Sequence, residues 1–594
     1  MEVRATFDME ITQLIKEGIA KAVNELYEHD VQMSEVQVSP TRKEIEGDFT
    51  VVVFPFTRAA KKAPPVLAAE LGDFLVKNVA DIASFGVIKG FLNLTLSEAY
   101  WSKFLEGIVA QENYGKHDAT GKTSVVEFSS PNTNKPLHLG HVRNILLGWS
   151  MSKVLEMAGD EVKRVQIIND RGIHICKSML AWQKFGNGET PESTGMKGDH
   201  LIGKYYVKFS SLEKEQKAAL KAEGSDSEPQ ILTEAREMLR KWEANDPEIR
   251  QLWEMMNGWV YAGFGETYEN LGVRFDKLYY ESNTYLLGKD MIEKGLEKDV
   301  FYKEEDGSVW ANLEDVKLDK KIVLRSDGTS VYVTQDLGTA QERYKDFEMD
   351  ASIYVVGDEQ DYHFNVLFEI LKRLGESYAE GLHHLSYGMV ELPSGKMKSR
   401  EGTVVDADDL MKEVVGIAKS ESLERGDVSG LTGERQQEAW RRIGMAALKF
   451  HMIRVTPRKK MLFDPQESVD IQGQSGPFVQ YSYVRTKSVL AKAGDWSGDI
   501  LAYQTPQPQE KDLLMIIRKY PDTIKEAAKN YDPSLIANYT YELAKSYNKF
   551  FHDIPILRAE TEAAKAFRLQ LTKVVGEVLT SALDLLGIEV PERM

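Results

Sequence analysis

The stretch from residue 123 to residue 170 constrains the fold more than any other part of the sequence. It begins with TSVVEF, which is typical of a buried strand, continues with HVRNILLGWSMSKVLEMAGD, which is typical of a helix, and ends with VKRVQIIND, a second apolar strand. A strand, a helix and a strand in direct succession form a βαβ unit of the nucleotide-binding kind, whose two strands lie parallel in one sheet. The sequence therefore predicts a Rossmann-type parallel sheet.

The rest of the chain divides into regions of different pattern, as expected because 594 residues make about three or four domains. Residues 1–120 mix amphipathic helix with strand-like runs and predict an α+β domain. The α/β pattern of residues 121–455 is interrupted at about 185–247 by a polar, charged run that indicates a helical insertion. Residues 456–594 show long helical periodicity and predict an all-α domain. We therefore expect a multidomain α/β fold.

Composition and charge exclude several classes of protein. No window is apolar for the roughly 18 residues that a membrane span needs, and the N-terminus lacks the order of a signal peptide. Cys176 is the single cysteine, which fits a reducing compartment, so we expect a cytoplasmic protein. The net charge of −18 argues against a sequence-independent coat on a polyanion. A local basic run at 441–460 is either a nucleic-acid patch or a solvated helix face.

Two histidines, His138 and His141, stand with Gly140 at the start of the helix in the βαβ unit. A metal pair on a helix usually has a spacing of four, and here the spacing is three with no thiolate nearby, so we expect no protein-bound metal. Two histidines satisfied within a core remain an alternative. The sharper interpretation is a phosphate site, in which backbone amides and imidazoles donate hydrogen bonds to the anion.

A phosphate site of this kind calls for a second cationic element, because transfer at an α-phosphorus leaves a pyrophosphate to be neutralised. The segment PSGKMKSREGTVV, residues 393–405, supplies one: Lys396, Lys398 and Arg400 alternate between two glycines. An ordinary mobile surface turn is the alternative interpretation. The presence of HLGH in the same chain favours the first interpretation. In it, the glycines let the loop move and bring its cationic side chains to the anion.

HLGH and KMKSREG resemble the two signature motifs of class I aminoacyl-tRNA synthetases. Within that class, five further segments resemble arginyl-tRNA synthetase: SSPNTNKPLHLGH, NDRG, GDHLIGKYYVKF, SDGTSVYVTQDLGTA and LLGIEVPERM. A lone HxGH would be weak because other nucleotidyltransferases share it, but the ordered set covers nearly the whole chain. The resemblance implies ATP-dependent activation of arginine to an adenylate and its transfer to tRNA-Arg, with Mg²⁺ accompanying ATP as substrate.

The resemblance also assigns residues. It implies catalytic roles for Lys135, His138, His141, Lys396 and Arg400. It implies contacts with ATP for His138, Gly140, His141, Gly357, Asp358 and Met397. It implies contacts with arginine for Asn132, Glu281, Tyr332, Asp336 and Gln360. It implies contacts with tRNA for Tyr481, Tyr483, Arg485 and Tyr547. On sequence alone, Glu281 and Asp336 would be ordinary surface acids and the tyrosines core residues.

The loop departs from the family pattern, because Lys398 stands where serine is usual and Arg400 where the second lysine is usual. Arginine keeps the charge but presents a planar fork. Lys135, just before the histidine motif, matches the position that compensates for an irregular loop in this family. Which of Lys135, Lys396 and Arg400 meets the pyrophosphate stays open.

The resemblance implies tRNA-Arg, L-arginine and ATP as partners, no membrane, no DNA, and a monomer. It also implies that the adenylate forms only when tRNA is bound, that the N-terminal domain contacts the tRNA corner, and that the helical C-terminal domain binds the anticodon. Three alternatives remain: a class I synthetase for another amino acid, a non-catalytic tRNA-binding relative, and a nucleotidyltransferase acting on a small alcohol phosphate.

Overall fold

A computed structural model describes residues 8–42, 44–393, 405–425 and 430–594. The chain divides into two compact units. Within the described residues, the first unit contains the N-terminal segment up to Gly115 together with 482–521 and 542–581. The second contains 116–481, 522–541 and 582–594. The units are interleaved in the sequence, so neither is a single continuous segment.

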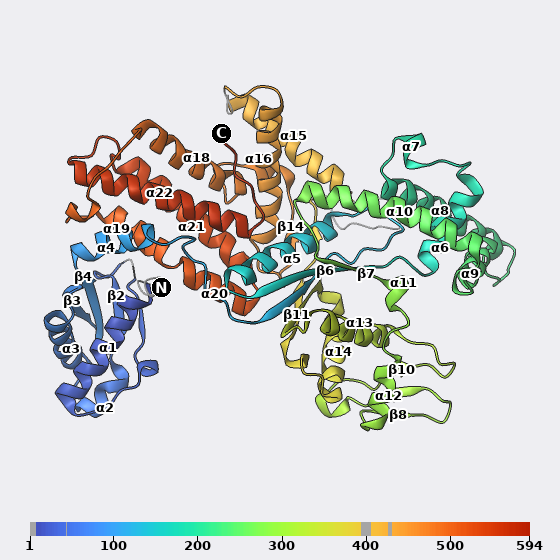
Figure 1. Ribbon diagram of the computed structural model, residues 1–594, viewed down its shortest axis with the longest axis horizontal. Helices are drawn as coiled ribbons and strands as arrows, with labels where there is room; N and C mark the ends of the chain where they lie inside the picture. The colour runs from blue at the N-terminus through green and yellow to red at the C-terminus, as the bar shows by residue number, and fades with distance from the viewer. Residues whose placement is uncertain (1–7, 43, 394–404, 426–429) are drawn as a thin grey trace. The chain divides into compact units, whose positions relative to one another are not determined.

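A five-stranded parallel sheet forms the centre of the second unit, with strand order β12-β11-β5-β6-β7. Its strands are β5 Thr123–Glu127, β6 Glu161–Ile168, β7 Lys277–Tyr280, β11 Ala351–Gly357 and β12 Leu382–Tyr387. α5 (Leu139–Met157) lies on one side of the sheet, and α13 (Tyr332–Phe347) and α14 (Asp361–Leu374) lie on the other (Figure 1). The predicted parallel α/β core is confirmed.

The helix α5 is buried on nearly all of its faces. Fourteen of its residues are buried, which explains why its sequence shows no amphipathic stripe. The close packing is visible at Gly148, where a Cβ atom would come within 2.3 Å of the Phe128 ring. The helix that starts at the histidine motif is therefore held in place along its whole length.

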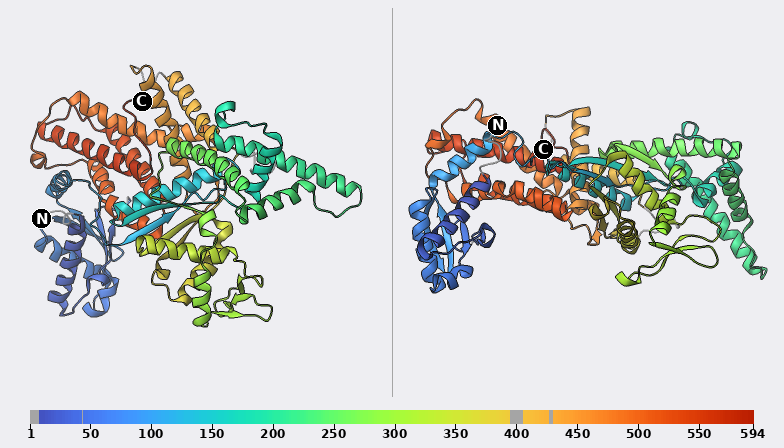
Figure 2. Two further views of the ribbon diagram at one scale, coloured as in Figure 1. Left: turned by 45° about the vertical axis from the view of Figure 1, so that its right-hand side comes forward. Right: turned by 60° about the horizontal axis from the view of Figure 1, so that its bottom comes forward.

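A bundle of helices is inserted between β6 and β7, longer at both ends than the predicted 185–247 segment. Figure 2 shows its helices beside one another in green. They are α6 Ile173–Phe185, α7 Pro191–Thr194, α8 Gly198–Ala222, α9 Gln230–Glu243 and α10 Pro247–Leu271. The long helix α10 has clear end signals: the Asp246 side chain accepts from two backbone amides at its start, and Gly272 ends it at φ 67°.

A small antiparallel subdomain follows β7. It contains α11 Glu281–Thr284, α12 Lys289–Glu297, β8 Phe301–Lys303, β9 Val309–Ala311 and β10 Lys321–Leu324. Ser330 forms an isolated antiparallel bridge with Leu324, and α13 begins two residues later at Tyr332. The unit then continues through β13 Val390–Glu391, α15 Ala407–Arg425, α16 Glu434–Ile453, β14 Met461–Leu462 and α17 Pro465–Val469.

The N-terminal region has the predicted α+β character, with an antiparallel sheet of order β1-β2-β4-β3. Its elements are α1 Asp8–Tyr27, β1 Val38–Pro40, β2 Phe49–Val52, α2 Thr57–Ala60, α3 Pro64–Asn78, β3 Ile82–Ile88, β4 Phe91–Leu96 and α4 Glu98–Val109. The C-terminal region is helical, as predicted. Its helices are α18 Gly476–Ala493, α19 Pro508–Arg518, α20 Tyr520–Asn530, α21 Ser534–Asp553 and α22 Glu562–Leu585.

The last part of the chain, residues 582–594, belongs to the second unit. Its backbone carbonyls accept hydrogen bonds from Ser150 of α5 at Leu585 (2.8 Å) and from Lys449 of α16 at Gly587 (2.6 Å). The tail is thus fixed against the helix that carries the histidine motif. None of the helices in the described ranges has the length and apolar character to cross a membrane.

Candidate active site

The carboxyl ends of β5 and β11 are where the topology of the central sheet predicts a ligand site. β5 and β11 are neighbours, but the chain leaves β5 toward β6 and leaves β11 toward β12. In open α/β sheets ligands bind where the strand order reverses in this way. The histidine motif follows β5, Gly357 ends β11, and Asp358 and Gln360 follow it.

The two histidines of the motif form a reciprocal cap at the start of α5. The His138 amide donates to Nδ1 of His141 (3.1 Å), and the Gly140 amide donates to Nδ1 of His138 (3.1 Å). Because each Nδ1 accepts, each ring carries its proton on Nε2. The ring centroids are 3.9 Å apart, so two Nε2–H donors lie side by side at the helix start.

Both imidazoles are held neutral. Burial and the neighbouring Lys135 charge lower the pKa of His138 to about 4. Burial, His138 and Lys135 lower the pKa of His141 well below its ordinary value. These shifts place Lys135 close to both rings, where the sequence expected a cation. At neutral pH the motif therefore offers two uncharged donors beside an ammonium group.

The helix start differs from expectation in one respect. The Gly140 amide, expected to contact a phosphate, is occupied by the His138 ring, and the Leu139 amide donates to the Val405 carbonyl (3.1 Å). A Cβ on Gly140 would lie 3.1 Å from Cε1 of His138. The glycine therefore makes room for the imidazole, and the donors available to an anion are the Nε2 atoms.

The end of the predicted basic loop is joined to the histidine motif. The Leu139 amide donates to Val405, the Ala407 amide donates to the Leu137 carbonyl (3.0 Å), and His138 and Asp406 form an antiparallel bridge. Lys396, Met397 and Arg400 lie outside the described residues. The first described residues after them, Val405 to Ala407, lie beside His138.

Glu281 and Asp336, the expected readers of the arginine guanidinium, lie near one another. Glu281 begins α11 just after β7, and Asp336 lies on α13. Burial raises the pKa of Glu281 to about 7, and the carboxylates of Asp170 and Asp336 contribute to the rise while Arg171 opposes it. A buried carboxyl whose pKa is raised by burial and by neighbouring carboxylates is a candidate partner for a cation.

Two supporting residues were not found from the sequence. Asp170 accepts from the Ser282 amide (2.8 Å) and from the Tyr261 hydroxyl (2.9 Å), which fixes the start of α11. His363 of α14 lies with Nε2 2.6 Å from Oδ2 of Asp336. The one sequence signal for His363 is its position three residues after Gln360, which alone does not indicate contact with a residue on another helix.

The other expected arginine contacts lie at element ends. Asn132 is exposed where β5 is extended by a bridge to Asn169, and Gln360 is exposed at the end of the short 3₁₀ turn Asp358–Gln360. Tyr332 is the first residue of α13, one turn before Asp336, and its side chain is 78% exposed. These positions face solvent at the ends of the strands, so a substrate can reach them.

Similarity to known proteins agrees with this geometry. Residues 105–464 match the family model described as "tRNA synthetases class I (R), catalytic domain". The "Arginine--tRNA ligase" of Parabacteroides distasonis is 53% identical over 99% of this chain and 100% of its own length. That of Bacteroides thetaiotaomicron is 52% identical over the same shares.

The chain belongs to the arginyl-tRNA synthetase family.

Two solved arginyl-tRNA synthetase structures share the fold. The enzyme of Thermus thermophilus matches with a TM-score of 0.78 at 24% identity, covering 98% of this chain and 100% of that one. The enzyme of Plasmodium falciparum matches with a TM-score of 0.76 at 18% identity, covering 98% and 99%. The predicted fold class of a synthetase of this family is thereby confirmed.

The two remaining family models fall on the flanking regions. Residues 13–96 match "Arginyl tRNA synthetase N terminal domain", and residues 479–594 match "DALR anticodon binding domain". The expected domain boundaries near 120 and 455 stay predictions, because the compact units interleave rather than break at single positions.

The expected RNA contacts of this synthetase family member need one correction. Tyr547 is fully buried in α21, with its ring packed near Phe550, so it does not present a face to a base. Arg485 is held by Asn548 (2.6 Å) and lies over the Phe551 ring. Tyr481 and Tyr483 are half-buried on α18. Contact of these three residues with tRNA stays a prediction.

The basic run at 441–460 is largely used inside the protein. Arg441 and Arg442 pair with Glu438 and Glu589, and Lys449 is buried against the Gly587 carbonyl. Only its end, Arg458 to Lys460, is exposed among the basic residues of the run. Most of this run therefore stabilises the fold of the second unit.

Proposed function

We propose that this protein joins L-arginine to tRNA-Arg at the expense of ATP, releasing AMP and pyrophosphate. The observation that carries the proposal is the 53% identity with the "Arginine--tRNA ligase" of Parabacteroides distasonis across 99% of the chain. The neighbouring acids Glu281 and Asp336 support the choice of amino acid, since a guanidinium presents five donors that two carboxylates can accept. The Nε2–H donors of His138 and His141 support the nucleotide chemistry.

In the first step, an oxygen of the arginine carboxylate attacks the α-phosphorus of ATP. The bond to the bridging oxygen breaks, pyrophosphate leaves, and arginyl-adenylate forms. In the second step, a ribose hydroxyl of the terminal adenosine of tRNA attacks the arginyl carbonyl, and AMP leaves. No protein nucleophile takes part, so the side chains position the substrates and stabilise charge.

The described residues divide this work between the nucleotide end and the arginine end of the site. His138 and His141 donate to the phosphate oxygens on which charge grows, and Lys135 supplies a positive charge beside them. Gly357 and Asp358 contribute to the nucleotide side. Mg²⁺ enters with ATP as substrate and neutralises the pyrophosphate.

At the other end, Glu281 and Asp336 hold the guanidinium, with His363 orienting the Asp336 carboxylate. Asn132 and Gln360 hold the amino and carboxylate groups. Lysine is rejected because its ammonium has fewer donors than a guanidinium. Some carboxylate oxygens of the site would then have no hydrogen-bond partner. Tyr332 covers the guanidinium once the substrate is bound.

The proposal extends to partners and location. The N-terminal region contacts the tRNA corner, the C-terminal helices bind the anticodon, and adenylate forms only with tRNA bound. The protein acts as a cytoplasmic monomer. Residues 1–120, 121–455 and 456–594 serve as tRNA-corner, catalytic and anticodon domains.

The test is esterification of purified tRNA-Arg with labelled arginine, run beside lysine and cysteine. We expect charging with arginine alone, and no ATP–pyrophosphate exchange without tRNA. Charging with another amino acid, or tRNA binding without charging, would contradict the proposal. Exchange at full rate without tRNA would contradict the requirement for tRNA.

The arginine site is tested by Asp336→Ala. Loss of the carboxylate removes a charged partner of the guanidinium, so arginine activation is expected to be abolished while ATP still binds. Glu342→Ala is the matched control, because Glu342 is a half-buried acid of the same helix that forms a 3.8 Å ion pair with Lys345. Near-normal charging by the Asp336 variant would remove Asp336 from the pocket.

A further inference from the structure

A cluster of charged side chains holds the segment that pairs with the histidine motif. This segment, residues 405–408, leads into α15, where the Asp406 side chain accepts from the Asp408 amide (2.8 Å) and the Asp409 amide (3.2 Å). Asp406 is therefore both the cap of α15 and the residue bridged to His138. A side chain that holds Asp406 and Asp408 in place therefore also holds the backbone at His138.

Lys197, at the start of α8, is the first side chain that holds this segment. Its ammonium lies 2.6 Å from Oδ2 of Asp408 and 3.2 Å from Oδ2 of Asp199. It also donates to the Thr267 hydroxyl of α10 (2.5 Å), which in turn donates to Oδ1 of Asp408 (3.1 Å). Three elements distant in sequence, α8, α10 and α15, thus meet at one carboxylate.

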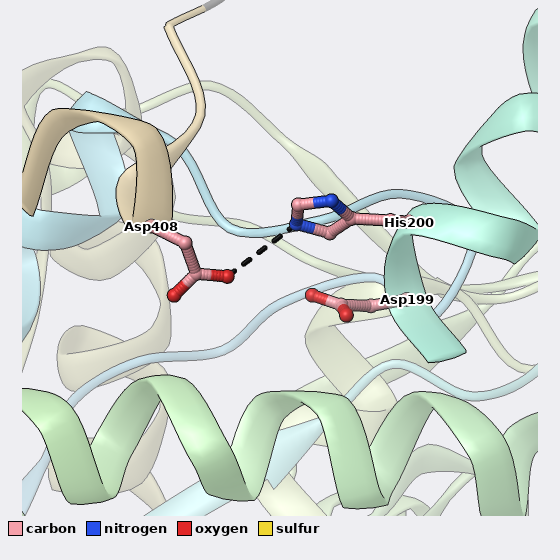
Figure 3. Close-up of side chains that lie close together, drawn as sticks. All are labelled: Asp199, His200 and Asp408. Carbon is pink, nitrogen blue, oxygen red and sulfur yellow. Dashed lines mark ion pairs between the residues drawn. The ribbon is translucent and has the colours of Figure 1, made fainter. Parts of the chain in front are cut away.

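His200 is the second side chain that holds this segment. It lies on the first turn of α8, and its Nε2 is 3.2 Å from Oδ2 of Asp406 and 3.4 Å from Oδ2 of Asp408. Figure 3 shows its ring turned toward Asp408, with Asp199 below. The imidazole is thus the one ring of the cluster that contacts both carboxylates of the loop anchor.

Asp199, His200 and Asp408 also have the spacing of metal ligands, which sequence reasoning did not anticipate. The Lys197 ammonium, however, lies against the carboxylate oxygens of Asp408 and Asp199 that a metal would need. The remaining oxygen of Asp199 faces the backbone of α10, since a Cβ on Gly263 would come within 2.3 Å of it. The cation of this cluster is therefore supplied by the chain itself.

We propose that His200 is a positioning residue for adenylate formation: it holds Asp406 and Asp408, and through their pairing with residues 137–139 it holds the His138 ring in place. The inference rests on the proposed function. His200 does not touch substrate, so its effect on chemistry passes through the backbone of the anchor.

The charge of the ring supports this role. Contact with Asp406 and then Asp408 raises the pKa of His200 to about 10, although burial opposes the rise. The groups that face it are Asp406 and Asp408 at the start of α15, and Lys197 and Asp199 on its own helix. The pKa of Asp408 is lowered in turn, to about 2, despite burial, by His200 and Lys197. The ring is an imidazolium throughout the neutral range.

The first test compares His200→Gln and His200→Lys with Lys204→Gln as control. Lys204 lies one turn further along α8 and pairs with Glu189 at the surface. We expect His200→Gln to lower kcat of adenylate formation by roughly tenfold or more, as small misplacements of catalytic groups do. The KM for arginine should stay within about twofold, because the guanidinium site is elsewhere. His200→Lys, which keeps a cation, should recover part of kcat.

The second variant, Asp406→Asn, guards against a folding defect. Asparagine caps helices as well as aspartate does, so α15 keeps its start while the charge facing His200 is lost. We expect the same split between kcat and KM, and we expect the double variant to lose no more than the worse single variant. Wild-type kcat in both single variants would overturn the proposal.

Two measurements distinguish this inference from the function it rests on. Wild-type charging of tRNA-Arg tests the function alone, and only the ratio of variant to wild type tests His200. In addition, the NMR resonances of the His200 ring should not titrate between pH 6 and 9. Titration near the ordinary histidine pKa, or a stoichiometric zinc ion found in the purified protein, would overturn the assignment.

Discussion

The histidines of the motif, His138 and His141, and the histidine of the anchor cluster, His200, have opposite charge states. His138 and His141 accept backbone hydrogen bonds at Nδ1, are buried beside Lys135, and have lowered pKa values. His200 faces two carboxylates and has a raised pKa. The same side chain is therefore a neutral donor in one place and a cation in the other, and its neighbours decide which.

This difference explains how the two sites divide their work. A neutral donor at the phosphate does not attract protons from the medium and keeps one tautomer across the working pH range. The His200 cation stabilises the charged form of Asp406 and Asp408, which burial alone would disfavour. The predictions below test whether these two roles are separate.

The largest effect is expected from removal of the His138 ring. His138→Ala should lower kcat of adenylate formation by roughly 10²- to 10³-fold, the cost of one donor at a site of developing charge. His138→Ser restores a side-chain acceptor for the helix start but not the ring donor, so it should recover stability of about 1 kcal/mol without recovering rate. Single-turnover adenylate formation and thermal unfolding measure the two effects. Equal rates for His138→Ser and wild type would break the comparison.

A smaller effect is expected from pH, and it sharpens the comparison. Between pH 6 and 8 neither His138, at about 4, nor His200, at about 10, changes its charge, whereas Glu281 titrates near 7. A protonated Glu281 cannot pair with the guanidinium, so the KM for arginine should rise toward about tenfold per pH unit below pH 7. At saturating arginine, kcat should stay flat over this range.

Glu281→Gln is the control for that profile. The amide removes both the charge and the titration, so this variant should show a high KM for arginine that does not change with pH. A wild-type profile in which kcat falls with acid while KM stays constant would assign the titration to another group.

The smallest effect is on stability, where the two histidine sites should give slopes of opposite sign. For His138 the unfolded chain binds more protons between pH 4 and 6.5, so its contribution grows as pH rises through that window. For His200 the folded chain binds more protons between pH 6.5 and 10, so its contribution is full below 6.5 and is lost as pH rises toward 10. Differences in unfolding free energy between wild type and His138→Gln or His200→Gln measure these slopes. Slopes of the same sign would contradict the charge assignment.

The sequence was sufficient to predict the sheet and the position of the histidine motif, for a physical reason, whereas Glu281 and Asp336 were implied only by the resemblance to a family. In a parallel sheet the residues just after each strand lie at the same edge. The positions of the strands in the sequence therefore predict which residues lie together at the site. His138 follows β5, Glu281 follows β7 and Gln360 follows β11. The arginine specificity itself came from resemblance to a family.

What the sequence did not predict depends on contacts between distant segments. Lys197 and Asp408 are 211 positions apart, and His363 reaches Asp336 across two helices. Neither pair leaves a periodic or local pattern. The resemblance implied a tRNA contact for Tyr547, but its ring lies in the core, as the sequence alone would have placed it.

The interleaving of the two compact units has a consequence for how the protein is made. Residues 522–541 and 582–594 complete the unit that contains the active site, and they follow segments that belong to the other unit. During synthesis, the second unit therefore cannot be completed until most of the first unit has been made. The hydrogen bond between Ser150 of α5 and the Leu585 carbonyl forms late for the same reason. A gene fragment cut near residue 455 would encode the histidine motif without the segments that secure its helix.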